Sequence, residues 1–237
     1  MTRPSTKAIE RSQIERFISN KDHGIHFTSL SENETPDFIA KTLEKKIAIE
    51  HTRYIDGEHK KIEHYRQQII DGARKRFEDE IGVNIQVSFS YSRNPMDKEY
   101  SKQYDVDLLF DMVNKIYQAN KTRNFRVSTA RMKIENKYID SLTVQSDTTW
   151  SNWQSSGAFF VKPADYEQVQ KHIDKKSDLV PTYPIDIDEK WLVIIAGIGN
   201  RSSGFRFDLL DGSILSRKRF DRVFFFDNRS EEIVELK

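Results

Sequence analysis

The sequence predicts a mixed α/β fold of the α+β type, in which helices flank a central mixed sheet. Segments whose apolar residues recur at helical spacing alternate with short segments typical of strands. The early strands follow one another as a meander, without intervening helices, and this favours a mixed sheet over a regular parallel one. With 237 residues, the chain is long enough for one large domain or two small ones.

Composition excludes several classes of protein. The chain has no cysteine, so neither a disulfide framework nor a zinc-thiolate site is available. The 38 Lys and Arg nearly cancel the 37 Asp and Glu, so any basic surface must be a local patch. The longest apolar run, residues 191–198, is far shorter than the roughly 20 residues of a membrane helix. The N-terminus lacks the apolar stretch of a signal peptide. We therefore expect a cytoplasmic protein without a membrane partner.

The first part of the chain predicts a core of helix, three-strand meander, helix and strand. Residues 6–19 have helical spacing and a Ser or Thr that can cap the helix. The three strands are expected at residues 25–30, 37–43 and 47–52, the second helix at 58–80, and the fourth strand at 83–91. Gly82 ends the second helix before that fourth strand.

The second part continues the alternation of helices and strands. Helices are expected at residues 102–118 and 164–176, and strands at residues 138–145 and 191–196. A terminal hairpin is expected from residues 223–226 and 232–236. We expect a single domain over residues 1–237. The loop-like segment 150–157 leaves open a C-terminal extension over residues 151–237.

Two acidic residues form the most informative feature of the sequence. Because strand side chains alternate, Glu50 faces away from the apolar side of its predicted strand, on which Ile49 and His51 lie. If residues 37–43 and 47–52 pair as a hairpin, Asp37 and Glu50 share a face of the sheet. Two close carboxylates repel each other unless a cation neutralises them. Oxygen ligands of this kind suit Mg²⁺ or Mn²⁺, which can activate water for phosphodiester hydrolysis.

In this order of elements, Pro36-Asp37 and Glu50-His51-Thr52 resemble the short motif of the PD-(D/E)XK, or restriction-endonuclease-like, superfamily. The resemblance covers roughly residues 6–91. It implies that Asp37 and Glu50 bind Mg²⁺, together with the main-chain carbonyl of His51. It also implies that Thr52 stands where the family has a lysine that orients the attacking water.

Thr52 departs from the family pattern because it carries no positive charge. One interpretation is that the charge comes from elsewhere, and Arg66 is the candidate because a guanidinium within an apolar stripe needs an acidic partner. Lys61 is the second choice. The other interpretation is that catalysis has been lost, and that the fold remains as a module that binds nucleic acid or a protein. On the first helix, Glu15 or Glu10 could complete the acidic cluster.

Each of these residues also has a purely structural interpretation. An Asp after a proline often belongs to a turn, and a Glu on a strand often faces solvent. The stem of Arg66 could pack on the core while its charged head reaches water. His51 lies on the apolar face of its strand, so a core histidine with a hydrogen-bond partner explains it better than a side-chain metal ligand.

A basic segment between the predicted helix at 102–118 and the next strand suits contact with nucleic acid. It contains five cations and no acid: Lys121, Arg123, Arg126, Arg131 and Lys133. A later cluster, residues 217–219 with Arg222, could extend the surface. We expect a Mg²⁺- or Mn²⁺-dependent nuclease that acts on DNA rather than RNA, with a homodimer as its assembly. The alternative is a catalytically inactive nuclease-like module that binds nucleic acid or a protein partner.

Overall fold

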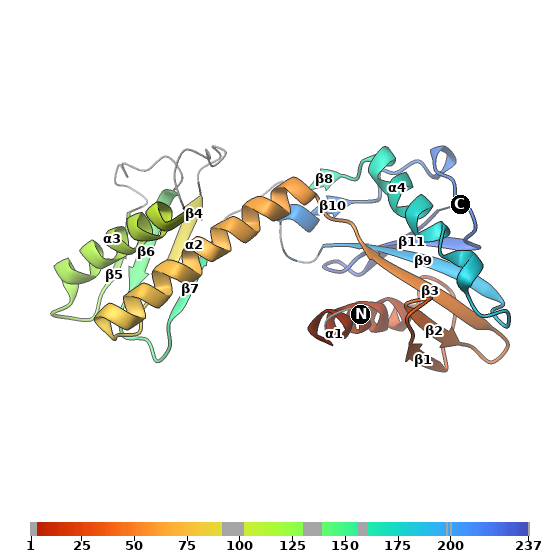
Figure 1. The fold of residues 1–237 in the computed structure, drawn as a ribbon, viewed down its shortest axis with the longest axis horizontal. Helices are drawn as coiled ribbons and strands as arrows, with labels where there is room; N and C mark the ends of the chain where they lie inside the picture. Colours follow the sequence, from red (N-terminus) through yellow and green to blue (C-terminus); the bar gives the residue numbers. More distant parts are fainter. Residues whose placement is uncertain are drawn as a thin grey trace. The chain divides into compact units, whose positions relative to one another are not determined.

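The computed structural model describes residues 4–91, 102–129, 139–155, 161–197, 199 and 201–236, and the chain forms two compact units. Unit 1 combines two stretches of sequence, Met1–Gly57 and Phe160–Lys237, and unit 2 is the stretch between them, Glu58–Phe159. Strands from both stretches of unit 1 hydrogen-bond in one sheet (Figure 1). The chain after residue 160 therefore extends the sheet that the first three strands begin.

Unit 1 is built on a six-stranded sheet with the strand order β1-β2-β3-β9-β11-β12. Its strands are β1 (Ser29–Glu32), β2 (Phe38–Lys41), β3 (Lys46–Arg53), β9 (Glu189–Ala196), β11 (Arg222–Asp227) and β12 (Glu232–Glu235). Strands β3, β9 and β11 are parallel, and the remaining neighbours are antiparallel. Shorter elements are β8 (Lys162–Pro163), β10 (Phe205–Arg206), η1 (Val180–Thr182), η2 (Arg201–Ser203) and η3 (Gly212–Ile214). The mixed sheet confirms the predicted fold class.

Helices α1 (Pro4–Ser19) and α4 (Tyr166–Ser177) cover opposite faces of this sheet (Figure 1). Strand β9 is apolar on both faces because it packs against both layers. Trp191, Val193 and Ile195 join the core that contains Phe17 of α1. The intervening residues of β9 join the core beneath α4, which is formed by Val169, Ile173, Leu192, Ile194, Ala196 and others.

Unit 2 packs two helices on a second sheet. Helices α2 (Gly57–Ile81) and α3 (Lys102–Asn120) lie beside a four-stranded sheet with the order β5-β6-β4-β7. Its strands are β4 (Gln86–Tyr91), β5 (Arg126–Ser128), β6 (Ile139–Gln145) and β7 (Asn152–Ser155). Phe77 of α2, Phe110 of α3 and Trp153 of β7 are buried in one apolar core between the helices and the sheet.

The expectation that the second helix and the fourth strand complete the core of the first three strands was wrong. Residues 58–80 and 83–91 do form α2 and β4, but both belong to unit 2. In unit 1, the strand that pairs with β3 is β9, and the helix that precedes β9 in the sequence is α4. Hydrophobic periodicity identifies an element but not its neighbour in space, and it therefore does not distinguish an inserted unit from the continuation of the core. The segment expected as a loop at 150–157 contains β7, held by the burial of Trp153.

None of the helices in the described parts of the chain has both the length and the apolar character needed to cross a membrane.

Candidate active site

Asp37 and Glu50 come together at one end of the β2–β3 pair. Phe38 pairs with Ile49 in the antiparallel register, so one further step places Asp37 opposite Glu50, as the hairpin hypothesis requires. The backbone N–H of His51 donates a hydrogen bond to Asp37 Oδ2 over 2.9 Å. The side chain of Glu50 is only 1% exposed, whereas that of Asp37 is 28% exposed. The pair thus combines one enclosed carboxylate with one that reaches solvent.

A lysine from α4 joins the two acids. Lys176 Nζ donates to Asp37 Oδ2 over 2.9 Å and to Glu50 Oε2 over 2.6 Å. Glu50 faces α4 because the side chains of β3 alternate, with Ile49 packed on the α1 side of the sheet. Asp165 caps the N-terminus of α4 by accepting a hydrogen bond from Gln168 N over 2.9 Å. The cap and the apolar face of α4 fix the position of the lysine.

The enclosed site changes the acidity of its three charged groups. Burial and the nearby charge of Asp37 raise the pKa of Glu50 to about 7, although Lys176 acts in the opposite direction. Burial would raise the pKa of Asp37, but Lys176 and the His51 N–H outweigh it, and that pKa is lowered. Burial would lower the pKa of Lys176, but the two carboxylates outweigh it, and that pKa is raised. Lys176 therefore stays protonated, and Glu50 is the group poised to change charge near neutral pH.

One oxygen of the site lacks a hydrogen bond of good geometry. Glu50 Oε1 is buried and makes no hydrogen bond of good geometry, and the same holds for the buried hydroxyl of Tyr183. Burial and the charge of Glu50 raise the pKa of Tyr183 above its usual range, so its hydroxyl stays protonated. The Tyr183 hydroxyl lies close enough to Glu50 to interact with it as a hydrogen-bond donor, although not with good geometry. A poorly aligned donor satisfies a buried carboxylate only in part.

Thr52 and His172 extend the site along the same face of the sheet. Thr52 Oγ1 lies 3.4 Å from His172 Nδ1, and His172 precedes Lys176 by one helical turn. Burial, together with Lys175 and Lys176, lowers the pKa of His172 and keeps its imidazole neutral at pH 7. Thr52 thus lies on the same face of the sheet as Glu50, but its side chain cannot supply the positive charge of a lysine.

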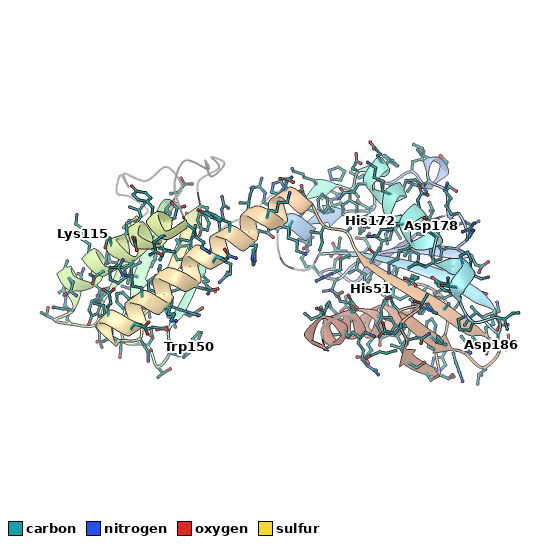
Figure 2. All side chains as sticks on the ribbon, in the orientation of Figure 1. His51, Lys115, Trp150, His172, Asp178 and Asp186 are labelled. Carbon is teal, nitrogen blue, oxygen red and sulfur yellow. The ribbon has the colours of Figure 1, made fainter. Side chains whose placement is uncertain are left out.

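The side chain of His51 points to the other face of the sheet. Its Nε2 lies 2.9 Å from Gln13 Oε1 of α1, and burial lowers its pKa to about 4. Figure 2 shows His51 on the side of α1 and His172 on α4. The expectation of a satisfied core histidine is confirmed. Only the main chain of His51 adjoins the acids, and the resemblance assigns a role to the main chain alone.

Of the two acids considered on α1, Glu10 lies near the site. Burial and the charge of Asp37 raise the pKa of Glu10. Glu10 and Asp37 both line a polar cavity of about 30 Å³, which also includes Lys7. That volume is enough for a water molecule. Glu15 instead accepts a hydrogen bond from Arg11 over 2.7 Å.

The two cations proposed to replace the family lysine both belong to unit 2. The guanidinium of Arg66 lies over the ring of Tyr91, 4.1 Å from its centroid, and Lys61 pairs with Glu58 over 2.6 Å. The cation that contacts both acids is Lys176, which lies on the helix expected at residues 164–176 and for which no role was expected. The signal that could have indicated it is that this helix precedes the strongly apolar strand β9.

The basic segment is partly described. Lys121 and Arg123 lie in the turn after α3, and Arg126 begins β5. Arg131 and Lys133 lie outside the described residues. In the later cluster, Arg222 is paired with Glu235 over 2.7 Å and thus contributes to packing within unit 1.

No family model, curated protein or solved structure matches this chain. Within the described residues, no group of three or more His, Asp or Glu side chains is arranged to hold a metal ion. The donor set available is two carboxylates, of which Glu50 interacts with the Tyr183 hydroxyl, with Glu10 beside the more exposed acid. Hard oxygen donors of this kind fit a hydrated Mg²⁺ or Mn²⁺, which retains several waters and needs only one or two carboxylates.

Proposed function

We propose that this chain is a divalent-metal-dependent nuclease that hydrolyses phosphodiester bonds of DNA, built on the restriction-endonuclease-like plan. The observation that carries the proposal is the convergence of Asp37, Glu50 and Lys176 on one another. Helix α1, strands β1 to β3, helix α4 and strand β9 follow the order of the core that the resemblance implies. This order supports the resemblance once unit 2 is treated as an insertion.

In this proposal Asp37 and Glu50 would hold Mg²⁺ or Mn²⁺, with the main-chain carbonyl of His51. The bound ion would lower the pKa of a water and offset charge on the phosphate. Lys176 takes the role that the resemblance gives to the position of Thr52. Its raised pKa keeps it a cation, so it orients water and stabilises developing negative charge rather than accepting a proton.

Cleavage of plasmid and single-stranded DNA with Mg²⁺ or Mn²⁺ tests this function. Asp37→Asn and Glu50→Gln should abolish cleavage while the circular dichroism spectrum is retained. Lys176→Met should lower the rate by roughly 100-fold, the usual effect of losing one charge-stabilising group. Lys175→Met is the matched control, because it removes an exposed neighbouring cation from the same helix and should leave the rate unchanged.

The controls separate true activity from a contaminating nuclease, because all variants are purified alike. If Asp37→Asn and Glu50→Gln cut DNA as well as the parent, the assignment of the site is wrong.

A second candidate function is an inactive nuclease-like module that binds nucleic acid. The observation that favours it is that Lys176 already contacts both acids, so one positive charge is present without a metal ion. Under this alternative the protein binds DNA with a steep dependence on salt and shows no metal-dependent turnover. Calorimetric titration with Mn²⁺ distinguishes the nuclease from the inactive module. The nuclease should bind Mn²⁺ in the parent and lose that binding in Glu50→Gln, whereas the inactive module should show no difference between the two proteins.

A further inference from the structure

One face of the unit 2 sheet is polar across all four strands. Residues opposite one another in register share a face, so the strand pairing defines rows across the sheet. One row contains Arg126, Gln145, Gln86 and Asn152. Two residues further along the strands, the next row on the same face contains Ser128, Thr143, Ser88 and Gln154. The row between them, on the other face, is apolar: Val127, Val144, Val87 and Trp153. Of these, Val144, Val87 and Trp153 join the core under α2 and α3.

The charge on this polar face is positive. Its two rows hold one cation, Arg126, and no acid, and the turn that leads into β5 adds Lys121 and Arg123. The loop after β6, which borders this turn, carries one exposed acid, Asp147. Further exposed acids at this end, Glu78, Asp79 and Glu80, lie in the last turn of α2 and not on the polar face of the sheet. Asp140, also exposed, lies at the opposite end of β6, beside the bulge in its pairing with β4.

An exposed tryptophan lies at the same end of the sheet as these cations. Trp150 is 57% exposed in the loop between β6 and β7, and Figure 2 labels it in unit 2. That loop lies against the basic turn, because Ser146 N donates to Phe125 O over 3.0 Å and Phe125 N donates to Ser146 Oγ over 2.9 Å. The other tryptophans, Trp153 and Trp191, are 3% and 0% exposed. The loop that carries Trp150 then runs to β7, so this indole lies at the same end of the sheet as the cations but towards its other edge. An indole in solvent is available to stack on a base.

We propose that this surface, formed by the two polar rows with Lys121, Arg123 and Trp150, binds single-stranded DNA. The three cations contact phosphates, Trp150 stacks on one unpaired base, and the amides and hydroxyls of the rows hydrogen-bond base edges. A duplex keeps its bases stacked on one another, so it offers none to the indole, and this favours a single strand. The choice of DNA rests on the proposed function, whereas the surface itself rests on the geometry of unit 2.

The test measures binding of a fluorescein-labelled 12-nucleotide DNA to the full chain by anisotropy, in EDTA so that no cleavage occurs. Three phosphate contacts predict that the logarithm of the affinity falls with the logarithm of salt with a slope of about −2. Arg126→Glu should weaken binding at least about tenfold. Lys115→Glu reverses an exposed cation on α3 and is the matched control, expected within about twofold of the parent.

Tryptophan fluorescence supplies a second readout, because Trp150 is the exposed one of the three tryptophans. Binding should quench the emission of the parent. Trp150→Ala should weaken binding at least about fivefold, and Trp150→Phe should retain most of the affinity but lose the quench. Arg126→Gln, a milder change than Arg126→Glu, should give an intermediate loss of affinity.

Three results would overturn the proposal: equal effects of Arg126→Glu and Lys115→Glu, no quench of the parent, or equally tight binding of the matched duplex. Tighter binding of the same sequence as RNA would overturn the choice of DNA. Asp37→Asn should bind like the parent. A parent protein that binds the oligonucleotide but does not cleave DNA with Mg²⁺ or Mn²⁺ rejects the nuclease and keeps the surface. A parent that cleaves DNA, together with unaltered binding by Trp150→Ala, rejects the surface and keeps the nuclease.

Discussion

Replacing Glu50 with glutamine should make the protein more stable at alkaline pH. The folded protein raises the pKa of Glu50 from 4.5 to about 7, through burial and the charge of Asp37. Each pKa unit corresponds to 1.36 kcal/mol, so ionising Glu50 costs the folded state about 3 kcal/mol. Glutamine has nearly the same shape and does not ionise. The variant therefore escapes this cost.

The sign of the effect depends on which state holds the proton. Below about pH 4.5, Glu50 is protonated in the folded and unfolded chains alike, so the site adds no pH dependence. Between 4.5 and about 7, the unfolded chain loses the proton and the folded chain keeps it, and the stability of the parent falls as pH rises. Above about pH 7 the loss is complete. The stability of Glu50→Gln relative to the parent should thus rise by about 3 kcal/mol between pH 4.5 and 8.

Urea denaturation of both proteins at half-unit steps of pH measures this difference. Glu167→Gln serves as a control for the loss of one carboxylate in solvent, because the side chain of Glu167 is 78% exposed. A difference between Glu50→Gln and the parent that stays constant from pH 4.5 to 8 would refute the reasoning. Added Mg²⁺ should stabilise the parent at pH 8 and have no such effect on Glu50→Gln, since a cation binds the ionised carboxylate.

Two further predictions concern packing in unit 1. Gly197 has φ of 73°, and a Cβ there would lie 2.1 Å from Asp227 Oδ1, so Gly197→Ala should lower the free energy of unfolding by about 1–3 kcal/mol in urea titrations. Gly24 has a similar φ, but an added Cβ there would meet no atom, so Gly24→Ala should lower the free energy of unfolding by less. An equal loss of stability in both variants would exclude the clash with Asp227 as the cause. Gln13→Leu should cost about 1–3 kcal/mol because it leaves buried His51 without its partner, and adding His51→Phe should recover part of the loss in a double-mutant cycle.

The local half of the site could be predicted from the sequence. The alternation of β3 places Ile49 and His51 on one face and Glu50 on the other, and a short hairpin is enough to bring Asp37 beside Glu50. Both inferences depend only on the two-residue period of a strand and on a nearby turn. The buried pairing of His51 with Gln13 follows from the same period, because the apolar face of β3 packs on α1.

The rest of the site depends on contacts between distant parts of the chain. Lys176 and Glu50 are 126 residues apart, and all of unit 2 lies between them in sequence. The cations nearest to the motif in sequence, Lys61 and Arg66, lie on α2 and belong to unit 2. A guanidinium within an apolar stripe does not require an acidic partner. An aromatic ring also contacts such a group favourably, and Tyr91 provides one.

If the proposed function is correct, the geometry of a strand beneath a helix accounts for a lysine at position 176 in the role that the resemblance gives to position 52. Two residues along a strand span about 6.6 Å, and four residues along a helix rise about 6 Å. Glu50 and Thr52 on β3 therefore match Lys176 and His172 on α4, with the order reversed because α4 runs back between the parallel strands β3 and β9. Lys176 contacts Glu50 from the helix directly opposite it, whereas a lysine at position 52 would reach Glu50 from two residues further along the strand. Under the proposed function, the helix would supply the charge that Thr52 lacks.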